Sequence, residues 1–541
     1  MERNDIYILN PHYHLRNDTR RIVMFSKNRT DANSSSNWYS FIHPLQALML
    51  SFFTFERSLE ENIKLLNNYF HCQHNEMEHY IMPFIENKEL LSTRWRGQEI
   101  VFPRNVLIRA SKESIYLNLQ PEDLVCDNLD LSERRLYEAP LSITLMLTNR
   151  CVTDCCYCYA DRKSRSGAQL STKRICELIE EAGKLKMKCV NMIGGEVFLH
   201  PDWAQILKKT IDCHVEAEYV STKMPLTKDI IGTLQQIGYK GIIQISLDTL
   251  DTKVIESTLK VSYEYLEAVK RGLILLDESG LKYQIATVLT TYNANIDILM
   301  ELYNFLTGLK NIVTWSIVPV HDSLYPKVEN FQSLKPDSEI LRTLSEYFDE
   351  ISKQSDFNII YDKKVVYKKY YLEKGGAKNF KGNKCPALNT NLFILPDGKV
   401  TICEQLYWHP FFIIGDVSRD KISSVWKSER ATYLAKNIWN DIRPVSTCSR
   451  CELRKECFES NNRCWSDILK AYGIENYDFP DPRCEYADEM KNYIENTTFL
   501  RELSTNNIVD INTGASYSNA QDNPYQSISK IFNFSNNLQT L

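Results

Sequence analysis

Three cysteines in one short loop, Cys151, Cys155 and Cys158, have the type and spacing that an iron–sulfur cluster needs. Their C-x3-C-x2-C arrangement supplies three thiolates from a tight stretch of chain, whereas a cubane cluster that only carries electrons normally takes four. Three thiolates leave one iron open to bind something else. On spacing alone, a zinc loop or a set of buried free thiols is the alternative interpretation.

The same loop resembles the cluster motif of the radical S-adenosylmethionine (SAM) enzymes, including the aromatic Tyr157 just before the third cysteine. The resemblance implies that the open iron of a [4Fe–4S] cluster chelates the amino and carboxylate groups of SAM. It also implies that an electron from the cluster cleaves SAM to a 5′-deoxyadenosyl radical. Tyr157 is accordingly predicted to lie in the cofactor site.

The run Gly194-Gly195-Glu196 follows the apolar segment Val190–Ile193, which is predicted to be a strand. Glycines let a ligand approach the backbone closely because they carry no side chain. The Glu196 carboxylate or the neighbouring carbonyls can accept hydrogen bonds from the SAM ammonium group, and the family resemblance implies this role for the run. Without that context, a Gly-Gly pair more often marks a turn.

Two further strand ends match the family more loosely. In Ser246-Leu247-Asp248, the serine stands where the family often carries one that contacts the SAM carboxylate or ribose, so Ser246 and Asp248 are predicted to bind the cofactor. A satisfied core hydroxyl at a strand end is the alternative for Ser246. The run Val220-Ser-Thr-Lys223 takes the place of a more usual Thr-Asn-Gly, and its lysine departs from that pattern.

A second group of cysteines lies beyond residue 380 and includes a C-x2-C-x5-C run. It resembles the SPASM extension of radical SAM enzymes that modify peptides, which holds two auxiliary [4Fe–4S] clusters. The resemblance assigns one cluster to Cys448, Cys451, Cys457 and Cys484. It assigns the other to Cys385, Cys403 and Cys464, one ligand short of a closed cluster. A zinc ribbon is the alternative, since tetrahedral zinc sites use similar cysteine pairs.

Strands and helices alternate through the middle of the chain. Apolar, β-rich runs occur at 141–147, 189–193, 216–221, 242–247, 283–289 and 313–318, with helical patterns between them. Repeated β–α units predict a parallel sheet with right-handed crossovers. Six units fit the open partial (β/α) barrel that the radical SAM resemblance implies. We therefore predict an α/β radical SAM core over 141–330, with the cysteine loop at the carboxyl edge of its sheet.

Residues 1–90 are predicted to form a separate domain of short strands followed by three helical segments. This order resembles the winged-helix-like recognition element of ribosomal peptide pathways, and the run from His43 to Leu50 is like the helix start seen there. The resemblance implies that a leader peptide adds as a strand to the sheet edge. A generic N-terminal cap on the barrel is the alternative. Residues 91–140 are predicted to be a linker.

The rest of the chain divides by composition. Residues 331–375 are charged and helical in pattern, so we predict a helical connector there. Residues 376–490 are predicted to be the cysteine-rich SPASM domain. Residues 491–541 are predicted to be a largely flexible tail, because the chain beyond about 503 is rich in Asn and Ser and nearly devoid of charge.

Charge and hydropathy exclude several classes of function. The net charge of −5 over 541 residues shows no basic footprint for nucleic acid. The longest apolar stretch, near 45–55, is shorter than the ~20 residues that span a bilayer. The N-terminus has no apolar signal-peptide core. We therefore predict a cytoplasmic protein with neither a nucleic-acid nor a membrane partner. In a reducing compartment its sixteen cysteines indicate metal ligation rather than disulfides. The six outside the predicted ligand sets are predicted to be buried small hydrophobic residues: Cys72, Cys126, Cys156, Cys176, Cys189 and Cys213.

Together these features predict a radical SAM/SPASM maturase that abstracts hydrogen from a ribosomally made precursor peptide and installs a cross-link. A thioether is favoured, because the incomplete ligand set leaves an iron to bind a substrate thiolate. The predicted partners are the precursor and an external one-electron donor of flavodoxin or ferredoxin type. No catalytic side chain is assigned. The alternatives are a maturase that generates formylglycine or a quinone cofactor, and a non-catalytic, zinc-stabilised binding protein.

Overall fold

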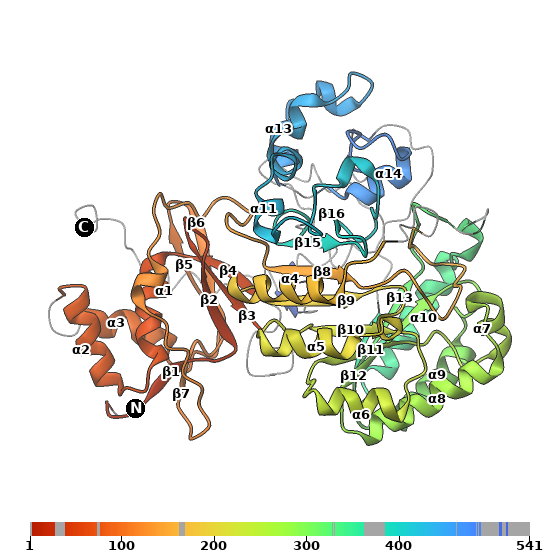
Figure 1. The fold of residues 1–541 in the computed structure, drawn as a ribbon, viewed down its shortest axis with the longest axis horizontal. Helices are drawn as coiled ribbons and strands as arrows, with labels where there is room; N and C mark the ends of the chain where they lie inside the picture. Colours follow the sequence, from red (N-terminus) through yellow and green to blue (C-terminus); the bar gives the residue numbers. More distant parts are fainter. Residues whose placement is uncertain are drawn as a thin grey trace. The chain divides into compact units, whose positions relative to one another are not determined.

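The computed structural model describes residues 3–27, 38–72, 76–161, 168–326, 328, 331–361, 385–460, 463–482, 484, 486–487, 508–510 and 515–517. The chain forms two compact units, Met1–Glu138 together with Asn506–Leu541, and Ala139–Thr505. The N-terminal residues are red to orange in Figure 1, and most of the second unit is yellow to blue. Of the predicted flexible tail, only the hairpin of β18 (Ile508–Asp510) and β19 (Ala515–Tyr517) lies within the described residues.

The first unit combines small antiparallel sheets with three helices. Its three-stranded sheet has the order β2–β3–β4, and further pairs among the described residues join β1 to β7, β5 to β6 and β18 to β19. The strands before residue 138 are β1 (Tyr7–Leu9), β2 (Tyr13–Asn17), β3 (Ile22–Ser26), β4 (Tyr39–Ile42), β5 (Leu91–Trp95), β6 (Gln98–Phe102) and β7 (Leu107–Arg109). The helices are α1 (Pro44–Ser51), α2 (Leu59–Tyr69) and α3 (Glu76–Ile81).

Side-chain caps begin two of these helices. Ser58 accepts a hydrogen bond from the Glu61 backbone N–H, and the Glu61 carboxylate accepts one from the Ser58 N–H at 2.8 Å, which completes a capping box before α2. At α1, His43 Nδ1 accepts from the Leu45 N–H at 3.2 Å. Burial lowers the pKa of His43 to about 4, so the ring is neutral near pH 7 and can accept this bond.

The predicted linker at 91–140 is not separate from the domain before it. Residues 91–109 supply β5, β6 and β7, and the first unit runs on to Glu138. Ile100, Phe102 and Leu107 are at most 1% exposed and share one core with residues near the N-terminus. A tight turn at Arg96-Gly97, both with positive φ, joins β5 to β6, and such turns mark a hairpin rather than a linker.

Arg21 holds the last residues of this unit against its sheet. The side chain is fully buried, its Nε donates to Asp18 at 3.1 Å, and its guanidinium lies 3.5 Å from the Phe41 ring centroid. Its Nη2 donates to the Arg135 carbonyl at 2.7 Å. Asp18 in turn accepts from the Tyr137 N–H at 2.9 Å. These bonds explain why the unit continues past its last strand.

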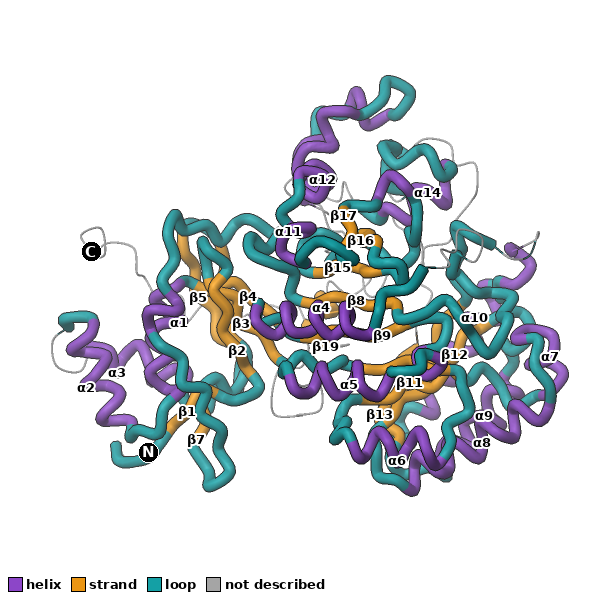
Figure 2. The backbone as a smooth tube through the Cα atoms, in the orientation of Figure 1, coloured by secondary structure: helices purple, strands orange, loops and turns teal. Residues whose placement is uncertain are grey.

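The second unit is built on six parallel strands, which confirms the predicted partial barrel. The strands are β8 (Ser142–Met146), β9 (Cys189–Ile193), β10 (Tyr219–Thr222), β11 (Ile242–Ser246), β12 (Tyr283–Leu289) and β13 (Ile312–Pro319), paired in this order. The helices between them are α4 (Thr172–Lys184), α5 (Trp203–Asp212), α6 (Lys228–Gln236), α7 (Thr252–Leu259), α8 (Tyr263–Glu278) and α9 (Ile296–Thr307). Figure 2 shows these helices lying along the outside of the sheet.

Two segments outside the predicted core extend this sheet to ten strands. β14 (Asn358–Tyr361) pairs parallel with β13, so the predicted helical connector contains α10 (Ser338–Ile351) and also an edge strand. The Asn-Ile-Ile-Tyr run of β14 is only four residues long, so its periodicity does not distinguish it from the helical pattern around it. At the other edge β15 (Asn391–Ile394) pairs parallel with β8, and β16 (Lys399–Thr401) and β17 (Gly415–Asp416) follow antiparallel. Residues 362–384, where the connector and the SPASM domain were predicted to meet, lie outside the described residues.

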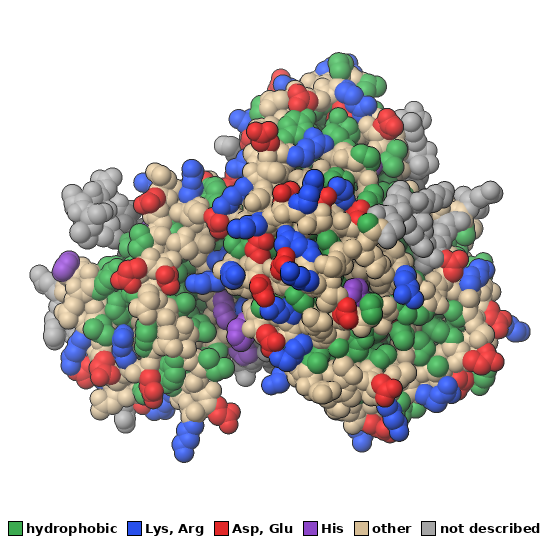
Figure 3. All heavy atoms as spheres, viewed as in Figure 1, with side chains coloured by type: hydrophobic (Ala, Val, Ile, Leu, Met, Phe, Trp, Pro, Cys, Tyr) green, Lys and Arg blue, Asp and Glu red, His purple; other side chains and the backbone are tan. Residues whose placement is uncertain are grey.

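Short helices complete the cysteine-rich region: α11 (Ile422–Trp426), α12 (Glu429–Thr432), α13 (Arg454–Ser460) and α14 (Trp465–Tyr472). On the face drawn in Figure 3, Lys and Arg side chains are interspersed with Asp and Glu, as expected for a small net charge. Among the described helices, none is long and apolar enough to cross a membrane.

Candidate functional site

The cysteine loop follows β8 at the carboxyl edge of the sheet, where α/β folds place their ligands. Cys155 is 4% exposed, and Cys151 and Cys158 are half-buried. The Thr153 hydroxyl lies 3.6 Å from the Cys151 sulfur and 3.2 Å from the Cys155 sulfur. The backbone N–H of Asp154 donates to the Leu259 carbonyl at 2.9 Å, which anchors the loop to the end of α7. The structure thus gathers the three predicted ligands on a fixed turn.

Gly195 lies directly against the start of this loop. A Cβ atom there would be 2.2 Å from the Arg150 carbonyl oxygen, so only glycine fits. The Gly195 N–H donates to the Thr148 carbonyl at 2.7 Å. The group that approaches the Gly195 backbone closely is therefore the Arg150 carbonyl of the chain itself, where the sequence predicted a ligand. The two motifs, distant in sequence, form one support beneath the cysteines.

Glu196 is 1% exposed, and its carboxylate accepts hydrogen bonds from groups of the protein. Its Oε1 accepts from the Thr222 hydroxyl at 2.7 Å and from the Phe198 N–H at 3.3 Å. Its Oε2 accepts from the N–H groups of Lys223 and Met224 at 2.9 and 3.1 Å. Burial raises the pKa of Glu196, and these bonds oppose that rise. The carboxylate thus clamps the turn after β10, and the carbonyls of the run stay as candidate acceptors.

Lys223, Asp248 and Tyr157 form a buried polar cluster beside the cysteine loop. Lys223 Nζ donates to the Tyr157 hydroxyl at 2.9 Å and to Asp248 Oδ2 at 3.1 Å, and the Tyr157 hydroxyl donates to the same carboxylate oxygen. The second carboxylate oxygen accepts from the Val288 N–H at 2.9 Å. Burial lowers the pKa of Lys223, but Asp248 outweighs it and the pKa is raised, so the lysine is charged.

This cluster explains the departure seen at Lys223 in the sequence. Tyr157 and Asp248 were predicted at the cofactor site and do lie together, but their polar groups bond to each other and to the lysine. The family pattern has glycine at this position, so the resemblance gave no reason to place a buried cation there. Ser246, the last residue of β11, is half-buried, and its hydroxyl makes no hydrogen bond to the described residues.

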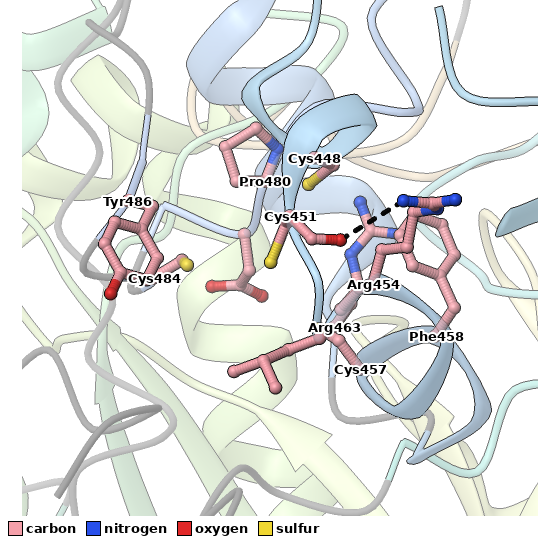
Figure 4. Close-up of a pocket in the computed structure, with 11 residues that line it drawn as sticks. Cys448, Cys451, Arg454, Cys457, Phe458, Arg463, Pro480, Cys484 and Tyr486 are labelled. Atoms are coloured by element: carbon pink, nitrogen blue, oxygen red, sulfur yellow. Dashed lines mark hydrogen bonds between the residues drawn. The ribbon is translucent and has the colours of Figure 1, made fainter. Parts of the chain in front are cut away.

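Four of the C-terminal cysteines line one pocket (Figure 4). Cys448, Cys451, Cys457 and Cys484 surround about 450 Å³ of empty space, including its opening to solvent. Burial raises the pKa of Cys457, and it raises that of Cys484 to about 11. A buried Arg463 has two N–H groups with no partner among the described residues and lines the same space. Four cysteines and a buried cation fit an anionic iron–sulfur cluster of the predicted ligand set.

Of the other three cysteines, Cys385 and Cys403 flank β15 and β16, and β15 pairs with β8 of the barrel, whereas Cys464 precedes α14. Cys403 follows β16, and burial raises its pKa to about 12, with further contributions from Glu404 and Cys385. Tyr407 is 2% exposed and follows Cys403 by four residues, and burial, followed by the charge of Glu404, raises the pKa of its hydroxyl. It packs in a core with Met146, Phe393 and Leu395. Cys464 Sγ lies 3.3 Å from the Ser466 hydroxyl.

Family models match both regions. Residues 145–306 match the radical SAM superfamily, and residues 385–452 match the SPASM model of an iron–sulfur cluster-binding domain. The chain is 24% identical over 271 residues to a probable GTP 3′,8-cyclase of Methanothermobacter thermautotrophicus, covering 49% of this chain and 84% of the cyclase. It is 26% identical over 157 residues to mycofactocin maturase MftC of Mycobacterium tuberculosis, covering 29% of this chain and 39% of MftC.

The fold is similar to crystal structures of SuiB from Streptococcus suis. SuiB bound to S-adenosylmethionine matches with a TM-score of 0.59 and 16% identity, over 88% of this chain and all of SuiB. SuiB has also been solved bound to its precursor peptide SuiA. The cofactors of the two matched domains are SAM with a [4Fe–4S] cluster, and auxiliary iron–sulfur clusters. This chain is therefore a radical SAM enzyme with a C-terminal SPASM domain.

Proposed function

We propose that this enzyme modifies a ribosomally made precursor peptide and installs a cross-link in it. The observation that supports this most is the extent of the similarity to SuiB, which covers 88% of the chain and so reaches beyond the barrel. The name of MftC, a maturase, supports the same class of substrate. The likeness to a GTP cyclase covers 49% of the chain and makes a nucleotide substrate the competing outcome.

We assign the SAM site to the carboxyl edge of the barrel. Cys151, Cys155 and Cys158 would hold the cluster, and the carbonyls of Gly194 and Gly195 would face the SAM ammonium. Glu196 would fix that backbone through its four hydrogen bonds rather than act alone. The free hydroxyl of Ser246, at the end of β11, is available to the SAM carboxylate or ribose.

The proposed product is a thioether. When bound, SAM and its cluster supply the radical that removes a hydrogen atom from a peptide C–H bond, and an auxiliary cluster supplies the acceptor for the one electron left when a deprotonated cysteine closes the C–S bond. Cys385, Cys403 and Cys464 are one ligand short of a closed cluster, which supports a site for the substrate thiolate. An external flavodoxin- or ferredoxin-type donor would deliver the first electron.

The first unit is the proposed recognition domain for the leader peptide. Its three-stranded sheet ends in two edge strands, β2 and β4. The Asn17 amide at the end of β2 donates to the carbonyls of Asp123 and Val125, so this edge is partly covered. The side chains of β4 are more exposed, with Tyr39 at 40%, although β6 lies close to this strand. We therefore propose β4 as the edge to which an extended leader adds by backbone hydrogen bonds.

A direct test uses short open reading frames from the neighbourhood of the gene. Each candidate peptide is incubated anaerobically with the reconstituted enzyme, SAM and a reductant, and 5′-deoxyadenosine and peptide mass are measured. We expect peptide-dependent 5′-deoxyadenosine and a product that has lost two hydrogens, with a matching loss of one free thiol. A Cys→Ser peptide should not lose them. Turnover with GTP and none with any peptide would contradict the proposal.

A further inference from the structure

Arg463 is a buried cation at the pocket of Cys448, Cys451, Cys457 and Cys484. The residue is 3% exposed, and its side chain lines the pocket beside these cysteines (Figure 4). In the chain it stands immediately before Cys464, which belongs to the other predicted ligand set. Arg463 thus lines the pocket of one cysteine set and is adjacent in the chain to a member of the other.

Only one end of its guanidinium is satisfied by the protein. Nη2 donates to the Phe479 carbonyl. Nε and Nη1 are buried and have no hydrogen-bond partner among the residues that the structure describes. Burying charged donors without an acceptor is unfavourable, so an acceptor outside the described residues is indicated.

Two aromatic rings fix the orientation of the guanidinium. Its Cζ lies 3.6 Å from the Phe458 ring centroid and 5.2 Å from that of Trp465. Phe458 follows Cys457, and Trp465 follows Cys464. Stacking of a planar guanidinium on such rings restricts it to one plane. The free N–H groups therefore cannot turn to solvent while this packing is intact.

The other charged groups that line the pocket have partners. Asp481 Oδ2 accepts from the Cys464 N–H at 2.9 Å. Arg454 is half-buried, and its Nη1 donates to the Cys451 carbonyl at 3.4 Å, the bond dashed in Figure 4, and to the Ser449 carbonyl at 3.5 Å. Arg463 thus differs from Arg454 in burial and in its free donors, although both line the same space.

We propose that Arg463 binds the auxiliary cluster of this pocket, through hydrogen bonds from Nε–H and Nη1–H to its sulfur atoms. A cluster held by four thiolates is anionic, and a buried cation with N–H···S bonds stabilises the more negative, reduced form. Arg463 would therefore raise the reduction potential of this cluster relative to a pocket without it. The proposal rests on the cluster-binding domain and does not depend on which substrate the enzyme modifies.

The test is an anaerobic redox titration of the reconstituted full-length enzyme followed by EPR. A Cys151→Ala/Cys155→Ala/Cys158→Ala background removes the radical cluster, and loss of a signal in Cys484→Ala identifies the cluster of this pocket. We expect Arg463→Met to shift its reduction equilibrium at least tenfold toward the oxidised form, which is 59 mV for a one-electron couple. The Fe–S stretching bands in resonance Raman spectra should shift in the same variant.

Arg454→Met is the matched control, because it removes the same charge from the same pocket at a half-exposed, already bonded position. It should shift the equilibrium by no more than about threefold, a screened-charge effect. Arg463→Lys keeps the charge without the planar donors and should fall between wild type and Arg463→Met; it also supplies the measurement if Arg463→Met fails to retain iron. An unchanged potential in Arg463→Met or Arg463→Lys with full iron content, or equal shifts in the Arg454 and Arg463 variants, would overturn the proposal.

Discussion

The two cysteine regions differ in how their buried charged side chains are hydrogen-bonded by the protein. Beside the loop of Cys151, Cys155 and Cys158, the buried lysine is paired with Asp248 and Tyr157, and Glu196 accepts four hydrogen bonds. In the pocket of Cys448, Cys451, Cys457 and Cys484, two guanidinium nitrogens of the buried Arg463, Nε and Nη1, have no hydrogen-bond partner within the described part of the chain.

The difference follows from what each region must hold. On the proposed assignment, the loop region would support a cluster that keeps a site open for SAM, and its own polar groups are satisfied by the protein and hold the strand ends in position. The C-terminal pocket is lined by four thiols, and if it holds the proposed auxiliary cluster, the buried donors of Arg463 would be left for that cluster. Satisfied polar networks stabilise a rigid scaffold, whereas an unsatisfied buried donor indicates an absent partner.

The largest expected effect comes from the loop cysteines. Replacing Cys151, Cys155 and Cys158 with alanine should abolish SAM cleavage, because no ligand set for the radical cluster is left. The auxiliary clusters and the fold should persist, as shown by iron analysis and circular dichroism. Cys156→Ala, a buried cysteine in the same loop, should retain SAM cleavage. 5′-Deoxyadenosine formation by the triple variant would refute the assignment.

Gly195→Ala should come next, because a Cβ would meet the Arg150 carbonyl oxygen at 2.2 Å and displace the start of the cysteine loop. We expect the reconstituted variant to lose most of the radical cluster, measured as iron and as SAM-dependent 5′-deoxyadenosine. Gly232→Ala in α6 has nothing within 4 Å of the added atom and should instead stabilise the protein by about 0.5–1 kcal/mol. Equal behaviour of the two variants would argue against the close packing.

The Lys223–Asp248 pair should show a large coupling in stability. Lys223→Met leaves a buried carboxylate uncompensated and should lower the free energy of unfolding of the second unit by about 3–5 kcal/mol. Lys223→Met/Asp248→Asn should cost less, since the remaining polar groups are neutral. Urea denaturation measures both. The exposed pair Lys208–Asp212 is the control, and Lys208→Met should cost less than about 1 kcal/mol.

The smallest of these effects is expected at Glu196. Glu196→Ala should weaken SAM binding by about 1.5–3 kcal/mol, as for loss of charge-assisted hydrogen bonds that order the site. Calorimetric titration of the reconstituted enzyme with SAM measures the change. Unchanged affinity would show that the backbone of Gly194 and Gly195 holds its position without the carboxylate, and would weaken the contrast between the two regions.

Local patterns in the sequence predicted much of the second unit. The six parallel strands and their helices follow from short-range periodicity. At α4, apolar residues recur at i, i+3, i+4 and i+7 and are buried: Ile175, Leu178, Ile179 and Ala182. The capping box at Ser58 and Glu61 was equally visible, because all its parts lie within four residues. The predicted linker at 91–140 was wrong, because the pairing of β1 with β7 joins residues about a hundred apart.

The sequence by itself determined the class of chemistry of this protein: cysteine spacing predicts the ligands of its clusters, and alternating strands and helices set the barrel. Only the tertiary structure decided how that chemistry is supported. It placed β15 beside β8, paired Lys223 with Asp248 and Tyr157, and left Nε and Nη1 of Arg463 without a hydrogen-bond partner among the residues described. The physical reason is that hydrogen bonds and burial depend on which segments meet in space, and these partners are separated by 25 to about 250 positions in the chain.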